Sequence, residues 1–457
     1  MTDGANRKPL GRIADFCDGT ALALLALAAL VSPTQWSLEP VRGLHVAPSD
    51  PLLLLAAGTW GMARLLQREW RRLFVIPWPA AAFLAWMLLS CITALDRPGA
   101  AKEWIQSFAY FGVGLTLFLD ALAHRGPLAV RAAFGILLGT GAVVVLLAFL
   151  QYAGTTDAML APGLLYFRDY APYLPDGALE PTDWLGHLSV RGTFGNRNVL
   201  GGFLALVLPF AFALALEGKG LSCRLAGLAL AVAGCLVNLS GASMAALLAV
   251  FVLQAAAKSR AAAVATLLGS VALLFLVLPN LPRENTWELM RSIAPFDADS
   301  GEPARRYADW QAASEMVADR PWLGVGPGGY QRNIGPYYGT VPRATGPSEP
   351  DIQNLYLVLA TTSGVPAAGF FLLLLACGAH RALGQRRAAR RACAGVALAI
   401  PCADFRCRSA LRLGAAGALA AYAVAAVWSP LLVRGIGLPL ALVLALATMP
   451  PVEPRRR

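Results

Sequence analysis

The feature that most constrains this chain is the number of long apolar runs along it. A helix that crosses the hydrocarbon core of a bilayer needs about 20 mostly apolar residues. Twelve stretches approach that length, at residues 18–36, 51–67, 74–95, 104–123, 132–152, 198–216, 222–239, 241–257, 261–281, 354–379, 409–429 and 431–450. Charged residues make up only 14% of the 457 residues, against roughly 25% in soluble domains. We therefore expect an all-α polytopic membrane protein with about 12 transmembrane helices.

The distribution of charge along the chain predicts how it is oriented. With the N-terminus in the cytoplasm, 24 of the 38 Lys and Arg residues fall on the cytoplasmic side, and 19 of the 27 Asp and Glu residues fall on the other. Cytoplasmic connections carry an excess of Lys and Arg, so both termini are expected in the cytoplasm. None of the eight cysteines falls in an outer connection, where an oxidising compartment would favour disulfides. The net charge of +11 thus indicates membrane sidedness and not a nucleic-acid partner.

Two connections on the outer side are much longer than the others. Residues 153–197 form a loop of 45 residues, and residues 282–352 form a loop of 71. Long loops in compact proteins commonly carry function, so we expect the site there. The chain then divides into residues 1–152 with helices 1–5, the first loop, residues 198–281 with helices 6–9, the second loop, and residues 353–457 with helices 10–12 and a cytoplasmic tail.

The first long loop ends in a basic segment directly before a helix, Arg191-Gly-Thr-Phe-Gly-Asn-Arg-Asn198. Arg191, Arg197 and the unpaired N–H groups of the first helical turn are all able to bind an anion at the membrane surface. The same two arginines are equally compatible with side chains that simply extend to the membrane interface. The spacing alone does not decide between these interpretations.

The second long loop contains a helical pattern. Tyr307, Trp310, Ala313 and Val317 recur at helical spacing, and Pro321 ends the pattern because the residue before a proline avoids helical angles. The sequence therefore predicts a short amphipathic helix that lies on the bundle.

A glycine-rich segment, Trp322-Leu-Gly-Val-Gly-Pro-Gly-Gly-Tyr330, follows this pattern. It matches Gly-x-Gly-x-x-Gly formally, but no strand precedes it and no helix begins at it, so we interpret it as a tight turn and not as a dinucleotide site. Further along, Gly364, Pro366 and Gly369 interrupt the tenth apolar stretch early. Broken helices at membrane depth are tolerated where they line a cavity.

Taken together, four sequence blocks and the twelve apolar stretches resemble the O-antigen ligase and polymerase superfamily. The blocks are Arg191-x-x-x-Gly-Asn-x-Asn198, Arg306-x-x-x-Trp310, Asp319-Arg-Pro-Trp-Leu-Gly-Val-Gly-Pro-Gly-Gly-Tyr330, and Asn354-x-Tyr-Leu ahead of Gly364. The resemblance is specific over about residues 180–380 and rests on topology elsewhere.

The resemblance implies a GT-C-like glycosyltransferase of the bacterial inner membrane, with both long loops in the periplasm. Such an enzyme takes a glycan from undecaprenyl pyrophosphate and passes it to a lipid, protein or glycan acceptor, without a metal or nucleotide cofactor. Arg191 matches the family's motif arginine and is the implied pyrophosphate ligand, because arginine forms bidentate hydrogen bonds to phosphate. Further substrate-binding residues implied by the blocks are Arg197, Asn198, Arg305, Arg306, Trp310, Tyr330 and Asn354.

The base that accepts the proton of the acceptor hydroxyl is not obvious from the sequence. Gln353 stands where the family usually has a histidine, and glutamine does not take up a proton near neutral pH. Asp351, Glu349 and His187 are the neighbouring alternatives for a catalytic role. Ser240-Gly241 likewise replaces a common Ser-Arg pair, and Thr362 replaces a frequent glutamate.

Two other functions are compatible with the sequence. The first is a non-catalytic relative that binds such glycans or assists their export. The second is a solute transporter, which would place ionisable residues inside its spans. Asp120, near a span end, is the only acidic candidate for that role, so we expect transport least.

Overall fold

The computed structural model describes residues 7–34, 38–41, 44–152, 190–238, 240–277, 302–338, 352–395 and 402–449. The helices of the N-terminal part are α1 (Arg7–Val31), α2 (Ser49–Leu66), α3 (Trp78–Ser90), α4 (Arg97–Ser107), α5 (Leu115–His124) and α6 (Gly126–Tyr152). Those that follow are α7 (Arg197–Glu217), α8 (Leu221–Val237), α9 (Gly241–Ala256), α10 (Arg260–Val277), α12 (Glu302–Asp319), α13 (Tyr330–Asn333), α14 (Leu355–Ser363), α15 (Val365–Gly395), α16 (Cys402–Ala425) and α17 (Gly437–Thr448).

Short elements join some of these helices. Two 3₁₀ turns, η1 (Trp70–Phe74) and η2 (Cys91–Thr93), flank α3, and a third, η6 (Gly335–Tyr338), follows α13. A π-helical segment, η3 (Phe108–Gly114), joins α4 to α5. The antiparallel strands β1 (Leu38–Val41) and β2 (Leu44–Val46) form a small hairpin.

A helix lies in each of the twelve apolar stretches, and within the described residues five helical segments are long and apolar enough to cross a membrane. These five are Leu10–Val31, Arg97–His124, Gly126–Gln151, Arg197–Glu217 and Val365–Arg387. The remaining apolar helices of the described segments are shorter, so the number of twelve spans stays a prediction. The helical fold and these five segments are those of a multi-pass membrane protein.

Several helix boundaries differ from those predicted. Helix α1 already ends at Val31 and not near residue 36, because Pro33 follows and the residue before a proline disfavours helical angles. Helix α17 begins only at Gly437, six residues after the start of the predicted 431–450 stretch. The hairpin β1–β2 was not predicted from the sequence. By contrast, the predicted break in the tenth stretch is confirmed, since Gly364 has a φ of +82° between α14 and α15.

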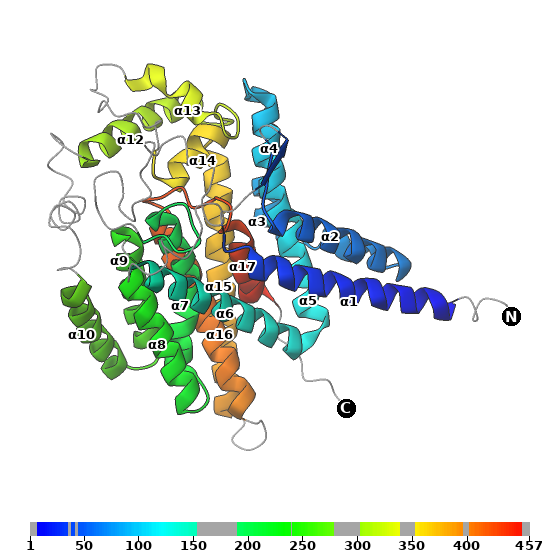
Figure 1. The fold of residues 1–457 in the computed structure, drawn as a ribbon, viewed down its shortest axis with the longest axis vertical. Coiled ribbons are helices and arrows are strands. Elements are labelled where there is room, and N and C mark those ends of the chain that lie inside the picture. The colour runs from blue at the N-terminus through cyan, green and yellow to red at the C-terminus, as the bar shows by residue number, and fades with distance from the viewer. Residues whose placement is uncertain are drawn as a thin grey trace.

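Helices α8, α9, α15 and α16 run up and down the view in Figure 1, with α12 and α13 above them. We call the end of the bundle that carries α12 and α13 the α12 end. Helices α1 and α2 pack side by side and run across the same view (Figure 1). The bundle thus combines upright and steeply inclined helices.

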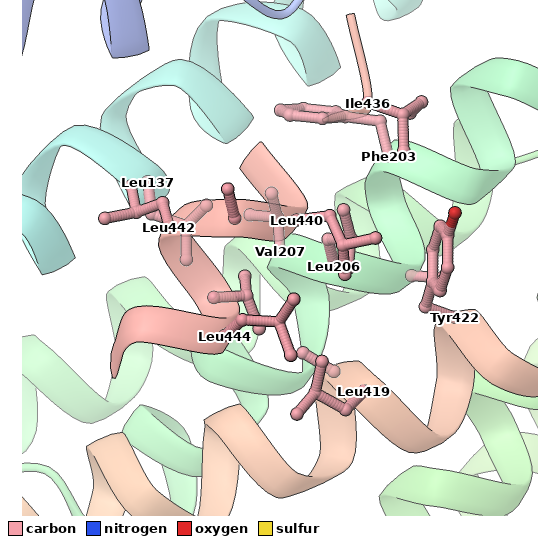
Figure 2. Close-up of a cluster of buried hydrophobic side chains, with 14 of the residues drawn as sticks. Leu137, Phe203, Leu206, Val207, Leu419, Tyr422, Ile436, Leu440, Leu442 and Leu444 are labelled. Carbon is pink, nitrogen blue, oxygen red and sulfur yellow. The ribbon is translucent and has the colours of Figure 1, made fainter. Parts of the chain in front are cut away.

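Helix α7 lies at the centre of the hydrophobic core. Every residue from Val199 to Ala213 is buried, which is expected for a helix that is apolar on all sides. Figure 2 shows Phe203, Leu206 and Val207 of α7 among side chains of α6, α16 and α17. The N-terminus of α7 is therefore held in place by packing along the whole helix.

A buried amide ties this core together. Pro209 lies inside α7, where a proline cannot donate a backbone hydrogen bond. The side-chain nitrogen of Gln254, on α9, donates to the carbonyl of Pro209 at 3.1 Å and to that of Leu413 at 3.0 Å. One side chain thereby links α9 to both α7 and α16.

An ion cluster joins helices α1, α2 and α5. Arg64 of α2, only 4% exposed, forms ion pairs with Asp18 of α1 and, at 2.9 Å, with Asp120 of α5. Trp60 donates to the same Asp120 carboxylate at 2.8 Å. Removing one partner of a buried ion pair typically costs about 3–5 kcal/mol, so this cluster fixes α1, α2 and α5 relative to one another.

Replacement of Gly364 by alanine is expected to destabilise the fold. The added Cβ would lie 1.9 Å from the carbonyl oxygen of Trp322, at a φ that strains any residue with a side chain. A loss of about 2 kcal/mol or more is expected, measured as a lower thermal unfolding midpoint of the purified protein. Gly369→Ala is the control, since its Cβ meets nothing within 4 Å and alanine favours a helix. Equal midpoints for the two variants would contradict the packing of Trp322 against Gly364.

Candidate functional site

The basic segment before α7 is held by one glutamine at the end of α6. The side-chain oxygen of Gln151 accepts from the N–H groups of Arg191 (3.2 Å) and Gly192 (2.8 Å), and its nitrogen donates to the carbonyl of Gly192 at 2.9 Å. Gly192 has a φ of +58°, which glycine adopts without steric cost. Phe194 is fully buried and packs against Phe203. The backbone at Arg191 is therefore fixed on both sides.

Helix α7 begins directly after this segment with a side-chain cap. The carboxamide of Asn196 accepts from the N–H of Val199 at 2.9 Å, and Arg197 is the first helical residue. Arg191 and Arg197 are both half-buried. A helix N-terminus carries a partial positive charge, so this end of α7 combines two guanidinium groups and a helix dipole that all favour an anion.

Asn198, predicted to bind substrate, connects α7 to the start of α9. Its side-chain oxygen accepts from the hydroxyl of Ser240 at 3.0 Å. The backbone N–H of Ser240 in turn donates to the side-chain oxygen of Asn238 at 3.2 Å, and both residues are buried. The Ser240-Gly241 pair thus forms part of a buried polar contact beside the N-terminus of α7.

The segment before α14 places Gln353 in an unusual conformation. Gln353 is half-buried and has a φ of +46°, which few residues other than glycine adopt. Asn354, predicted to bind substrate, is buried and caps α14 by accepting from the N–H groups of Tyr356 (3.0 Å) and Leu357 (3.1 Å). The structure therefore gives Asn354 a role in helix capping.

Helix α12, predicted as an amphipathic helix ended by Pro321, is present and ends at Asp319. Its packing forms a second, smaller core, which we call the α12 core and which consists of Ala308, Ala312, Ala313, Met316, Val325, Ile334, Tyr338 and Ile352. The buried face of α12 is shifted by about one residue from the predicted stripe, since Ala308, Ala312 and Met316 are buried. Asp309 is also buried, and its carboxylate accepts from the hydroxyl of Tyr338. Trp310 donates to the carbonyl of Ile352 at 2.7 Å, next to Gln353.

The glycine-rich segment is a tight turn, as predicted, and it is tied to α14. Gly324, Gly326 and Gly328 have φ values of +61°, +96° and +70°. The N–H of Val325 donates to Thr361 at 3.0 Å, and that of Gly326 donates to Thr362 at 2.9 Å. Tyr330, which begins α13, is half-buried against the α12 core. The hydrogen bonds of this turn therefore fix the α12 core beside the C-terminal end of α14.

The segment between α16 and α17 joins the α7 site to α14, and the sequence did not reveal this. Leu431 packs on Gly202 of α7, and Gly435 packs on Phe194. At the other side, the N–H of Leu355 donates to the carbonyl of Ala426 at 2.9 Å. The N-terminal ends of α7 and α14 thus contact the same short segment, residues 426–436.

That segment also contributes an arginine that sequence reasoning missed. Arg434 is half-buried and acts electrostatically on Asp50 and Glu103. Burial raises the pKa of Asp50, while the N–H of Ala47, at 2.9 Å, and Arg434 act in the opposite direction. The sequence did contain a signal for Arg434, because it is a charged residue inside the otherwise apolar stretch 431–450.

Some predicted site residues cannot be placed. His187, Asp351 and Glu349 lie outside the described residues, and so do the side chains of Arg305 and Arg306, which belong to the first turns of α12. Among the described segments, no group of three or more His, Cys, Asp and Glu side chains has a metal-binding arrangement. The described site is therefore built from arginines, amides and helix ends.

Comparison with known proteins finds a match over part of this site. Residues 197–372 match the family model described as O-antigen ligase; Arg191 lies six residues before the match, which covers less than half of the chain. No curated protein matches the chain. The match runs from the start of α7 through the α12 core to the first turns of α15. From the first turn of α7 to the first turns of α15, this chain is therefore similar to the O-antigen ligase family.

Proposed function

We propose that the protein transfers a glycan from undecaprenyl pyrophosphate to an acceptor at the extracytoplasmic face of the inner membrane. The observation that carries the proposal is the position of Arg191 and Arg197 at the N-terminus of α7, where the O-antigen ligase match begins. The donor is a lipid pyrophosphate, and the acceptor is a hydroxyl of a lipid, protein or glycan. No metal or nucleotide cofactor is required.

The reaction joins the acceptor oxygen to the anomeric carbon as the bond from that carbon to the pyrophosphate oxygen breaks. Negative charge then grows on the departing pyrophosphate. Arginine binds such oxygens through two parallel hydrogen bonds, and fixed positive groups stabilise developing charge without reorganising. Gln151 and the packing of Phe194 hold Arg191 for this role. The acceptor proton passes to Asp351, Glu349 or His187, because Gln353 has no basic group.

The α12 end is proposed to face the periplasm. The chain is proposed to have about 12 spans in a GT-C-like arrangement. Its five divisions are then residues 1–152, 153–197, 198–281, 282–352 and 353–457. The charge distribution along the sequence supports this orientation. Both termini are then cytoplasmic.

A non-catalytic relative that binds lipid-linked glycans or assists export is the second candidate. The observation that favours it is Gln353 next to the α12 core, together with the absence of an arginine from the Ser240-Gly241 pair. A transporter is disfavoured, because Asp120 pairs with Arg64 and accepts from Trp60. The Asp120 carboxylate is therefore already paired within the protein.

The proposed orientation predicts the labelling of single cysteines. In a cysteine-free background, Glu315→Cys on α12 is expected to react with a membrane-impermeant maleimide in intact spheroplasts, because Glu315 is exposed at the α12 end. In a second variant that keeps Cys223 as its single cysteine, this residue, which is exposed and lies near the start of α8 at the opposite end, is expected to react only after the membrane is permeabilised. The reverse pattern would invert the topology.

The anion site predicts that Arg191→Lys fails almost as badly as Arg191→Ala. A lysine keeps the charge but does not reproduce the planar guanidinium fork, so a loss of about 10²-fold or more in transfer is expected from both variants. Transfer would be measured with purified protein and a lipid-pyrophosphate donor. Arg260→Lys, at an exposed arginine of α10, is the control and should retain full activity. A fully active Arg191→Lys protein would reduce Arg191 to an interfacial charge.

The identity of the base predicts the effect of Gln353→His. Histidine is among the residues enriched at positive φ, so the backbone at position 353 should accept it. General-base assistance typically contributes 10²–10⁴-fold, and the variant is expected to raise the transfer rate if the rest of the site is intact. Native transfer that is lost on changing Asp351, Glu349 or His187 would identify that neighbour as the base. Donor binding without transfer by either protein would support the accessory function.

A further inference from the structure

A polar pocket lies apart from the α7 site, between the corner that joins α3 to α4 and the glycine turn. Its volume is about 270 Å³, and its lining includes Ala94, Asp96, Val325, Pro327, Arg332 and Asn333. In Figure 1, α4 and α13, which flank this corner and this turn, both lie toward the α12 end. The function proposed above does not use this pocket.

The charges in this pocket cancel. Arg332 donates to one oxygen of the Asp96 carboxylate at 2.7 Å, and the other oxygen accepts from the N–H of Gly99 at 3.1 Å, which caps α4. The Arg332 side chain is 73% exposed and that of Asp96 is 37% exposed, so both groups are accessible to a ligand. A balanced pair of this kind favours a neutral polar ligand over an anion, in contrast to the N-terminus of α7.

Both walls of the pocket are fixed by backbone contacts. Val325 belongs to the α12 core and donates its N–H to Thr361. Gly326 lies against Ala94, where an added Cβ would approach the Ala94 side chain to 2.3 Å. Asn333 is held as well, since its side-chain nitrogen donates to the carbonyl of Gly329 at 2.7 Å. Asp96 and Asn333 therefore stand in preset positions.

We propose that this pocket binds one sugar ring of the transferred glycan. A sugar presents hydroxyl groups that donate and accept hydrogen bonds, which Asp96, Arg332 and Asn333 match, and an apolar C–H surface, which Val325 and Pro327 match. The volume of about 270 Å³ lies just below the range of about 300–1,000 Å³ that holds drug-sized ligands, so the pocket suits a single ring and not a longer oligosaccharide. The inference rests on the proposed function and assigns that glycan a binding subsite separate from the pyrophosphate.

The test compares two pocket variants with a control at a neighbouring arginine. Asp96→Asn keeps a side chain that caps helices well but removes the charge, and Arg332→Gln removes the partner. Arg320→Gln is the control, because Arg320 is exposed in the same loop and does not line the pocket. Binding to the full-length protein in nanodiscs is measured with the free oligosaccharide released by mild acid from the lipid-linked glycan of the native host. Thermal unfolding verifies that each variant is folded.

Each pocket variant is expected to weaken oligosaccharide binding about tenfold, as loss of a charged hydrogen bond implies, while Arg320→Gln binds as the native chain does. In the transfer assay, the same variants should raise KM for the donor and leave kcat within about a factor of two. If the native chain transfers nothing but binds the oligosaccharide in an Arg332-dependent way, the transfer function fails and the sugar subsite stands. Native affinity in both folded pocket variants, no binding by the native chain, or binding of inorganic pyrophosphate that depends on Arg332 would each overturn the subsite.

Discussion

The complete burial of α7 is the constraint on which the rest of the structure depends. A helix that is apolar on every side is stable only when other helices surround it, and α6, α8, α9, α16 and α17 supply those surfaces. Close packing leaves little freedom for such a helix to shift. As a result, the polar groups at its first turn, Asn196, Arg197 and Asn198, occupy positions set by the hydrophobic core beneath them.

The sequence predicted the parts of the fold that depend on local patterns. Apolar runs predicted the helices, the spacing around Trp310 predicted α12, and Gly364 predicted the break between α14 and α15. The predicted boundaries at residues 36 and 431 were wrong, because the apolar run extends past the end of α1 at Val31 and begins before the start of α17 at Gly437. The hairpin β1–β2 was missed because four- and three-residue strands carry almost no periodic signal.

The candidate site could be predicted only in part, for a physical reason. Arg191 and Gln353 stand out in the sequence because charge and unusual residue types are visible there. The contacts that position them come from Gln151 and from residues 426–436, which are far away along the chain. Nothing in the local sequence indicates that a glutamine at the end of α6 is paired with a loop 40 residues later. The same holds for Arg434, whose effect on Asp50 arises only from folding.

The pairing of Arg64 with Asp18 has a consequence for how the first two helices enter a membrane. An arginine is costly to move out of water alone, and an opposite charge beside it offsets part of that cost. Because Asp18 lies on α1 and Arg64 on the neighbouring α2, the cost is lowest when these two helices leave water together. On the proposed twelve-span topology, in which α2 is the second span, we therefore expect α1 and α2 to insert together as one helical hairpin.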